Sequence, residues 1–147
     1  VVFPLHPRTE NRIAESGLGH FVSYADTAGK RRRAGIIATG PLGYLEFLSL
    51  MTYSKAVLTD SGGLQEETTV LGIPCLTIRP NTERPITCEM GANRLLENCD
   101  PSRLPAAVEE MIRNGAAGIR IPPRWDGKAG ERIVQTLLSF PAGCRTG

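Results

Sequence analysis

The sequence predicts an α/β fold, in which a Rossmann-like parallel β-sheet carries helices on both of its faces. Short apolar runs alternate along the chain with segments of helical spacing, which is the order typical of such a sheet. Sixteen glycines and eleven prolines supply the turns between these segments. With 147 residues, 41% of them hydrophobic, the chain is long enough to form one globular domain with a proper core.

In the N-terminal part of the chain, uninterrupted apolar runs predict strands and spaced apolar residues predict helices. The clearest helical spacing is that of Leu45, Phe47, Leu48, Leu50 and Met51. An earlier and shorter helix is expected to end at Gly17. In order, the expected elements are a strand at 1–6, a helix at 9–18, strands at 20–25 and 35–39, and a helix at 42–54.

In the remainder of the chain, the predicted helices have recognisable capping residues. Gly72 is a predicted C-terminal cap, and Gly115 marks the end of a later helix. Asp100 is a predicted N-cap, and Pro101 takes the first helical position. The expected elements are a strand at 55–60, a helix at 62–72, strands at 73–79 and 92–97, and helices at 100–115 and 127–140.

The charge and the hydropathy of the chain argue against two classes of partner. A formal net charge of +2 is too small to indicate binding to nucleic acid or to a membrane surface. The basic run from Lys30 to Arg33 is interpreted as a solvated loop. No apolar run approaches the ~18 residues that a membrane-spanning helix needs.

The four cysteines, Cys75, Cys88, Cys99 and Cys144, are spread along the chain without CxxC spacing. This pattern favours neither a zinc site nor a disulfide framework, so we expect no metal and a reducing cytoplasm. Cys75 lies in an apolar strand and is interpreted as a small core residue. The chain begins within a predicted strand (VVFPLHPRT), so we expect it to be a fragment of a longer protein.

The loops that follow the strands are the candidates for a binding site, because ligands of open parallel sheets bind beyond the carboxyl ends of the strands. We expect these loops to open onto one edge of the sheet. They are residues 6–8, 40–43, 60–63 and 79–84.

The segment LTDSGGLQEE, residues 58–67, indicates a phosphate site. A helix N-terminus offers free N–H groups and the positive end of a dipole. Gly62 and Gly63 let a phosphate approach the backbone closely, and Ser61 can donate its hydroxyl hydrogen. The alternative is that Ser61 is an ordinary N-cap and that the glycines form a turn, and the sequence leaves both interpretations open.

Glu67 can face the same crevice from further along the helix, where a carboxylate accepts two hydrogen bonds from a cis-diol such as ribose. Its neighbour Glu66 points about 100° away around the helix. The alternative for both glutamates is a solvated helix face, since glutamate favours early helical turns.

Two further loops carry basic groups. Arg84, in RPNTERP at residues 79–85, can pair with a diphosphate through two hydrogen bonds, and Glu83 is placed to orient it. His6 and Arg8 follow the first strand. His6 is either a functional residue at the carboxyl end of this strand or a structural histidine.

Together, LTDSGGLQEE, GIPCLTIRPNTERP, GANRL, PLGYLEFLSLM and WDGKAGERIV resemble the C-terminal domain of the UDP-N-acetylglucosamine 2-epimerases. The resemblance runs from HPR, residues 6–8, to the last predicted helix. It implies the glycosyltransferase-B fold, in which two Rossmann-like domains face each other across a cleft. Residues 1–147 would then be the C-terminal nucleotide-sugar-binding domain, without the N-terminal domain.

The resemblance also implies a role for each candidate residue. Ser61, Gly62 and Gly63 would hold the diphosphate, and Glu67 would bind the ribose hydroxyls. Phe47 would pack near the uracil, whose edge is read by backbone around Pro41 and Leu42. The residues expected beside the phosphates and the sugar are Arg84, Arg8 and His6, with His6 as the catalytic candidate.

The family reaction, as the resemblance implies, inverts C2 of the sugar by eliminating UDP to form a glycal and adding it back, which gives UDP-N-acetylmannosamine. A hydrolysing branch releases the free sugar. The elimination needs a base at C2 and stabilisation of the departing diphosphate. Because the acid/base carboxylates of the family belong to the N-terminal domain, this chain would bind UDP or UDP-N-acetylglucosamine without turning it over. No cofactor is implied, and the full-length protein would be a homodimer.

One position departs from the family pattern. Many bacterial members have HRREN where this chain has HPRTEN, so Pro7 replaces an arginine while His6 and Arg8 keep their places. In some members this region helps to bind a second, activating substrate molecule. The resemblance does not carry that regulatory site over to this chain.

Two other functions fit the same residues. A glycosyltransferase of this fold would use the same phosphate loop and ribose glutamate, and a non-catalytic nucleotide-binding module would keep the site without the chemistry. Carboxylates in the cleft of the N-terminal domain would indicate the epimerase, and an acceptor pocket would indicate the transferase. The third function is distinguished by whether the gene encodes an N-terminal domain.

Overall fold

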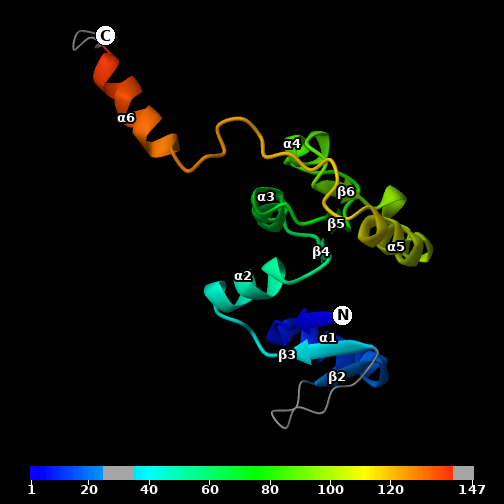
Figure 1. Ribbon diagram of the computed structural model, residues 1–147. Coiled ribbons are helices and arrows are strands. Elements are labelled where there is room, and N and C mark those ends of the chain that lie inside the picture. The colour runs from blue at the N-terminus through cyan, green and yellow to red at the C-terminus, as the bar shows by residue number, and fades with distance from the viewer. Residues whose placement is uncertain (25–34, 141–147) are drawn as a thin grey trace, which may run out of the picture. The chain divides into compact units, whose positions relative to one another are not determined.

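The structure, a computed structural model, describes residues 1–24 and 35–140 in two compact units, Val1–Leu50 and Met51–Gly147 (Figure 1). The basic run at residues 30–33 and Cys144 lie outside the described residues. In the part of the chain that is described, no helix is long and apolar enough to cross a membrane.

The first unit contains a three-stranded parallel sheet in the order β1-β3-β2. Its central strand holds the completely buried Ala38, and the Leu5 amide extends the ladder by donating to the Thr39 carbonyl over 2.9 Å. The strands are β1 (Val2–Pro4), β2 (Val22–Tyr24) and β3 (Ile36–Thr39), and the helical segments are α1 (Pro7–Glu15), η1 (Leu18–Phe21) and the first part of α2 (Tyr44–Thr52).

The second unit contains another three-stranded parallel sheet, in the order β4-β5-β6. Its strands are β4 (Val57–Thr59), β5 (Cys75–Thr77) and β6 (Asn93–Leu95). The helices are α3 (Gly62–Leu71), α4 (Pro85–Glu89), α5 (Leu104–Asn114) and α6 (Ala129–Ser139), and the 3-10 turns are η2 (Glu97–Cys99) and η3 (Pro101–Arg103).

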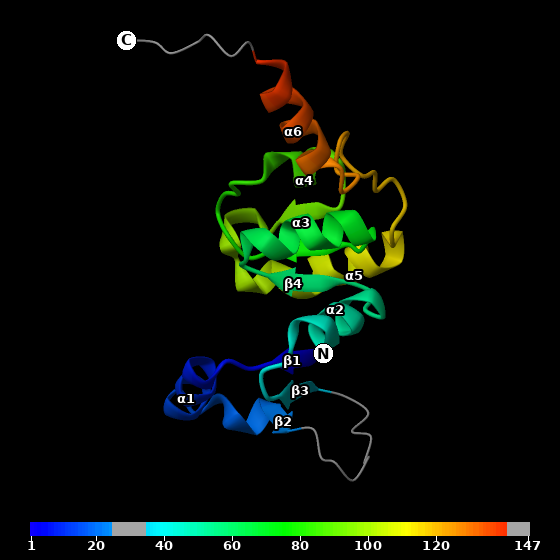
Figure 2. The ribbon, with the colours of Figure 1, turned by 90° about the vertical axis from the view of Figure 1, so that its left-hand side faces the viewer.

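Helices cover both faces of the second sheet, as Figures 1 and 2 show for α3 and α5. Side chains alternate between the faces of a strand, so the central strand β5 serves both helices. Leu76 points to one face, where it packs with Leu96 and with Met111 of α5 in the apolar core. Thr77 points to the other face, where its hydroxyl joins a polar network that reaches α3.

The predicted parallel α/β fold is therefore confirmed, with the strands paired in two sheets of three. The expectation that residues 1–147 form a single nucleotide-sugar-binding domain stays a prediction. So does the expectation that all four candidate loops meet at one edge.

The capping residues explain where the helices begin and end. Gly72 ends α3 with a φ of 68°, the left-handed conformation expected at this position. The Asp100 carboxylate accepts a hydrogen bond from the Ser102 amide over 2.9 Å, but the turn it starts is η3, and α5 follows it. The hydrogen bonds from the Ser102 hydroxyl and amide hold the pKa of Asp100 below its usual range. Helix α4 is absent from the sequence prediction, and its local signal is Pro85 at the first position.

We expect Leu76→Ala to lower the free energy of unfolding by about 2–5 kcal/mol, because it leaves a cavity in the core at a side chain that has no exposure to solvent. Leu138→Ala in α6 is the matched control, since Leu138 is 81% exposed, and it should change stability by less than about 0.5 kcal/mol. Urea unfolding followed by circular dichroism measures both. Equal effects would contradict the assignment of the core to β5 and α5.

Candidate functional site

The N-terminus of α3 directly follows β4 and is left without a side-chain cap. Ser61 occupies the N-cap position with extended backbone (φ −86°, ψ 129°), yet its hydroxyl makes no capping hydrogen bond. The Ser61 amide instead donates to the Thr59 hydroxyl over 3.0 Å, which fixes the turn between the strand and the helix. The first N–H groups of α3 are therefore not satisfied by their own cap and can receive an anion.

The two glycines that open α3 have no structural reason to be glycine. Neither Gly62 nor Gly63 has a positive φ. A Cβ atom built at Gly62 would meet nothing within 4 Å, and one at Gly63 would meet only the Ser61 hydroxyl oxygen at 3.8 Å. The backbone is thus open to solvent on this side, and a ligand atom can approach it without displacing protein.

Three consecutive side chains of α3 lie in three different environments. Gln65 is completely buried, Glu66 forms an ion pair with Arg84, and Glu67 is partly buried. Within the described residues the Glu67 carboxylate has no hydrogen-bond or ion-pair partner. The 100° step between neighbouring helical residues separates their directions, so Glu67 points away from the Arg84 contact.

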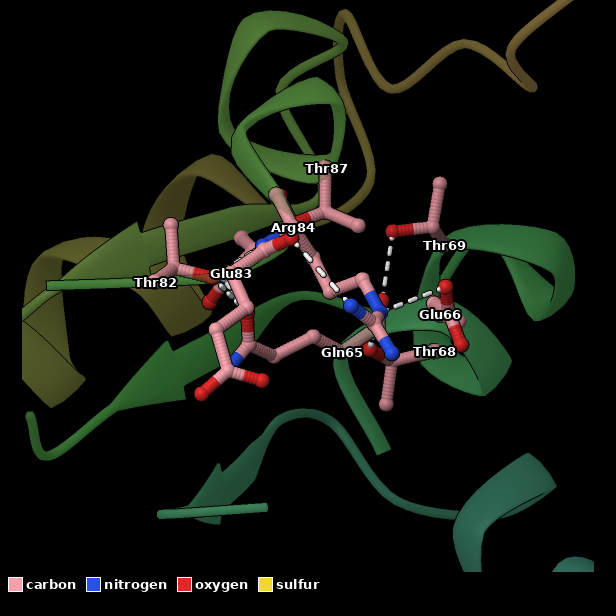
Figure 3. Close-up of polar contacts among 9 residues, drawn as sticks. Gln65, Glu66, Thr68, Thr69, Thr82, Glu83, Arg84 and Thr87 are labelled. Atoms are coloured by element: carbon pink, nitrogen blue, oxygen red, sulfur yellow. Dashed lines mark hydrogen bonds and ion pairs between the residues drawn. The ribbon is translucent and has the colours of Figure 1, made fainter. Parts of the chain in front are cut away.

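Arg84 lies beside α3 (Figure 3). Its Nε atom is 2.7 Å from Glu66 Oε1, in an ion pair whose N–H bond does not point squarely at the oxygen. Its Nη1 group donates to the Glu83 carbonyl oxygen over 3.2 Å. Both side chains of the ion pair are about 40% exposed, so the contact orients the guanidinium more than it stabilises the fold.

This arrangement corrects two expectations about the glutamates. The sequence places Glu83 to orient Arg84, but the Glu83 carboxylate lies 3.6 Å from Arg79, and it meets Arg84 only through its backbone carbonyl. The carboxylate that orients Arg84 belongs to Glu66, which is therefore not on a purely solvated helix face. The reason is tertiary, because the Arg84 side chain reaches from the 79–85 loop to Glu66 of α3 (Figure 3).

A set of buried polar side chains joins this loop to α3 and β6. Gln65 Oε1 accepts hydrogen bonds from the Thr82 hydroxyl at 2.5 Å and from Asn93 Nδ2 at 3.1 Å. Asn93 Nδ2 also donates to the Thr87 hydroxyl at 3.2 Å. Burial raises the pKa of Cys88, whose sulfur lies 3.5 Å from the same nitrogen, so this thiol stays uncharged beside the network at neutral pH.

In the first unit, His6 is the N-cap of α1. Its Nδ1 atom accepts a hydrogen bond from the Arg8 amide over 3.2 Å, and Pro7 takes the first helical position. This bond places the proton of the neutral ring on Nε2, which can then act as a donor to an anionic group. His6 therefore has a structural role as the cap of α1. Because the residue is exposed, this role leaves Nε2 available for a functional one.

Phe47 is partly buried in α2, and the loop before this helix is held by Glu46. The Glu46 carboxylate accepts a hydrogen bond from the Gly43 amide over 3.0 Å, while the Gly43 carbonyl accepts one from the Phe47 amide over 2.9 Å. This reciprocal arrangement is one half of a capping box and fixes the backbone that follows residues 40–42.

The sequence analysis missed the residues of the polar network, which are Gln65, Thr82, Thr87 and Asn93. A signal for them was present in α3. Its buried positions follow helical spacing but are filled by Gln65, Thr68 and Thr69 in place of apolar residues. Buried polar groups need partners, so this pattern points to a network beneath the helix.

The fold is an α/β fold of the glycosyltransferase-B type, as the known structures that resemble it show. Within that class, the sequence profile of the UDP-N-acetylglucosamine 2-epimerase family matches residues 1–138, and this chain belongs to that family. It corresponds to the C-terminal domain of the longer enzymes.

Two curated relatives illustrate the similarity. The UDP-N-acetylglucosamine 2-epimerase of Methanocaldococcus jannaschii is 42% identical over 137 residues, which covers 93% of this chain and 34% of that protein. The UDP-2,3-diacetamido-2,3-dideoxy-D-glucuronate 2-epimerase of Pseudomonas aeruginosa is 43% identical over 98 residues, covering 65% and 23%. The chain thus spans about a third, or less, of the length of these relatives.

Solved structures agree with this comparison. The Methanocaldococcus jannaschii UDP-GlcNAc 2-epimerase in complex with UDP-GlcNAc and UDP superposes with a TM-score of 0.71 at 41% identity, covering 93% of this chain and 35% of that one. The Neisseria meningitidis enzyme bound to UDP-GlcNAc gives a TM-score of 0.61 at 32% identity, covering 95% and 36%.

We expect Gly63→Ala to raise the free energy of unfolding by about 0.4–1 kcal/mol, because alanine fits the open space and favours the helix. Gly130→Ala is a matched control, since Gly130 is also the second residue of a helix and a Cβ atom there would meet nothing within 4 Å. Thermal unfolding compares the two. A clear loss of stability at Gly63 would mean that the protein itself requires this glycine.

Proposed function

We propose that this chain is the UDP-binding C-terminal domain of a UDP-N-acetylglucosamine 2-epimerase, which converts UDP-N-acetylglucosamine to UDP-N-acetylmannosamine. The observation that carries the proposal is the uncapped N-terminus of α3, with two glycines that nothing in the protein requires. The names of the relatives and the nucleotides bound in the similar structures support it.

In this proposal the diphosphate binds at the start of α3. The amides of Gly62 and Gly63 donate to the phosphate oxygens, and the uncapped Ser61 hydroxyl adds a third donor. Arg84 contributes the positive charge, because Nε and Nη1 are engaged by protein groups and Nη2 makes no hydrogen bond or ion pair within the described residues. An arginine held in this way neutralises the charge that builds on the departing diphosphate.

Glu67 binds the ribose. It lies further along α3 than Ser61, Gly62 and Gly63. Its carboxylate has no hydrogen-bond or ion-pair partner among the described residues, so it can accept hydrogen bonds from both hydroxyls of a diol. Phe47 of α2 packs near the uracil. His6 and Arg8 act at the phosphates and the sugar, where the Nε2 proton of His6 is available to a developing anion.

The base that removes the C2 proton is proposed to belong to the rest of the enzyme, so this chain binds nucleotide without turnover. We further propose that the full-length protein is a cytoplasmic homodimer. The relative from Pseudomonas aeruginosa, named for a diacetamido-glucuronate substrate, supports a second candidate in which the same UDP site serves a different sugar.

The test of the reaction is proton exchange at C2 of UDP-N-acetylglucosamine, followed by NMR in heavy water. The full-length protein should exchange this proton and form UDP-N-acetylmannosamine, and the 147-residue chain should not. Exchange only with the UDP-diacetamido-glucuronate sugar would select the second candidate. Exchange by the chain alone would show that the base lies within it.

In the same assay, His6→Asn separates the two roles of the histidine. Asparagine is a good N-cap, so this variant keeps α1 capped and removes only the imidazole. If the Nε2 proton acts on the developing charge, turnover should fall about 10²–10³-fold with a much smaller change in UDP affinity. An unaltered rate would assign His6 to the helix cap alone.

We expect Glu67→Gln to weaken UDP binding at least about tenfold, because hydrogen bonds to a charged group contribute roughly 1.5–3 kcal/mol each and one decade is about 1.4 kcal/mol. The loss should be much smaller for 2′,3′-dideoxy-UDP, which has no diol. Calorimetric titration measures both ligands.

Glu66→Gln is the matched control on the neighbouring residue. Glu66 contacts Arg84, which in this proposal binds the diphosphate. Because both ligands carry the diphosphate, this change should affect UDP and 2′,3′-dideoxy-UDP alike. An unchanged UDP affinity in Glu67→Gln would contradict the role of Glu67 in binding the ribose.

A further inference from the structure

Both polar groups of the Arg84 backbone are held by side chains that belong to one closed ring of hydrogen bonds. The Arg84 amide donates to the Thr82 hydroxyl at 2.9 Å, and this hydroxyl donates to Gln65 Oε1. The Arg84 carbonyl accepts from the Thr87 hydroxyl at 2.7 Å, and this hydroxyl accepts from Asn93 Nδ2. Asn93 Nδ2 and Gln65 Oε1 close the ring at 3.1 Å.

The direction of each hydrogen bond in the ring follows from the Arg84 backbone. An amide can only donate, so Thr82 must accept from it and turn its own hydrogen toward an acceptor, which is Gln65 Oε1. A carbonyl can only accept, so Thr87 must donate to it and offers its lone pair to an Asn93 N–H. The orientations of both side-chain amides are thereby determined, and Asn93 Oδ1 accepts from Thr77 at 2.7 Å.

The ring is buried at Gln65, Asn93 and Thr87, which makes the bonds among these residues difficult to replace. Gln65 and Thr87 have no exposure to solvent and Asn93 is 5% exposed, whereas Thr82 is partly exposed. Water cannot easily substitute for a lost partner at such depth, so removal of one hydroxyl leaves its neighbours unsatisfied. The side chain of Arg84, by contrast, reaches the half-exposed surface, where Glu66 holds Nε.

We infer that Gln65 and Asn93 are positioning residues, which act through Thr82 and Thr87 to set the backbone of Arg84 so that its guanidinium meets the diphosphate. The inference rests on the proposed function of Arg84. The ring holds the backbone of Arg84 in position, and Glu66 orients its guanidinium. Two consecutive residues of the phosphate-binding helix, Gln65 and Glu66, thus couple that helix to the arginine of the neighbouring loop.

A purely structural ring makes a different prediction from a positioning ring. If the ring only stabilised the fold, its loss would weaken every ligand of the site to the same extent. If it positions Arg84, its loss weakens ligands that carry the diphosphate and spares those that do not. UDP and uridine are therefore the two probes.

The test uses Thr82→Val and Thr82→Ser in the full-length protein. Thr82 is partly exposed and lies outside the helices, and valine keeps its shape while removing the hydroxyl between Arg84 and Gln65. Thr82→Val should weaken UDP about tenfold, the loss expected when one charge-assisted hydrogen bond is misplaced, and should leave uridine unchanged. Thr82→Ser keeps the hydroxyl and should restore UDP affinity.

A double-mutant cycle then measures whether the effect of Thr82→Val on UDP affinity depends on Arg84. Arg84→Ala should weaken UDP, and Thr82→Val should add nothing further in that background, because the residue that the ring positions is gone. Gln65→Met opens the ring from the helix side and should reproduce the selective loss. Equal loss of uridine and UDP, or full additivity with Arg84→Ala, would overturn the inference.

The outcomes also separate the inference from the proposed function. If Arg84→Ala weakens UDP while Thr82→Val and Gln65→Met do not, Arg84 keeps its phosphate role and only the positioning by the ring is wrong. If Arg84→Ala leaves UDP affinity unchanged, the phosphate role of Arg84 fails, and the positioning role fails with it.

Discussion

A polar side chain that is removed from water must find partners inside the protein, and in the second unit this requirement falls on Gln65. It lies between α3 and the sheet, where an apolar residue would be the usual choice. Its oxygen is the point at which α3, the 79–85 loop and β6 are joined. The position of Arg84, and with it the shape of the candidate phosphate site, depends on this one buried amide.

The same helix separates structural and ligand-binding roles by its geometry. Its N-terminal end presents uncapped amides and two unhindered glycines, and its buried face carries Gln65, Thr68 and Thr69. Glu66 and Glu67 are partly buried and point in different directions. Hydroxyl groups on the buried face bond back to the helix, as when Thr69 donates to the Gln65 carbonyl at 2.7 Å. The threonine hydroxyls are thus satisfied within the helix, whereas the buried Nε2 group of Gln65 has no hydrogen-bond partner among the described residues.

Glycine usually marks either a left-handed backbone or a crowded contact, and Gly72 shows the first case at the end of α3. Gly62 and Gly63 show neither. When the folded chain does not explain a residue, a ligand is the remaining physical reason for it. The phosphate interpretation of this turn therefore gains support from the geometry of the protein itself.

The sequence by itself determined the alternation of strands and helices, the capping residues at Gly72 and Asp100, and the loop that follows β4, because these depend on local conformational preference. It also placed the polar residues at the carboxyl ends of the strands. It could not determine that Glu66, and not Glu83, holds Arg84, or that Gln65 meets Asn93. Those contacts join residues far apart in the chain, and only the packing of α3 against the loop and the sheet brings them within hydrogen-bonding distance.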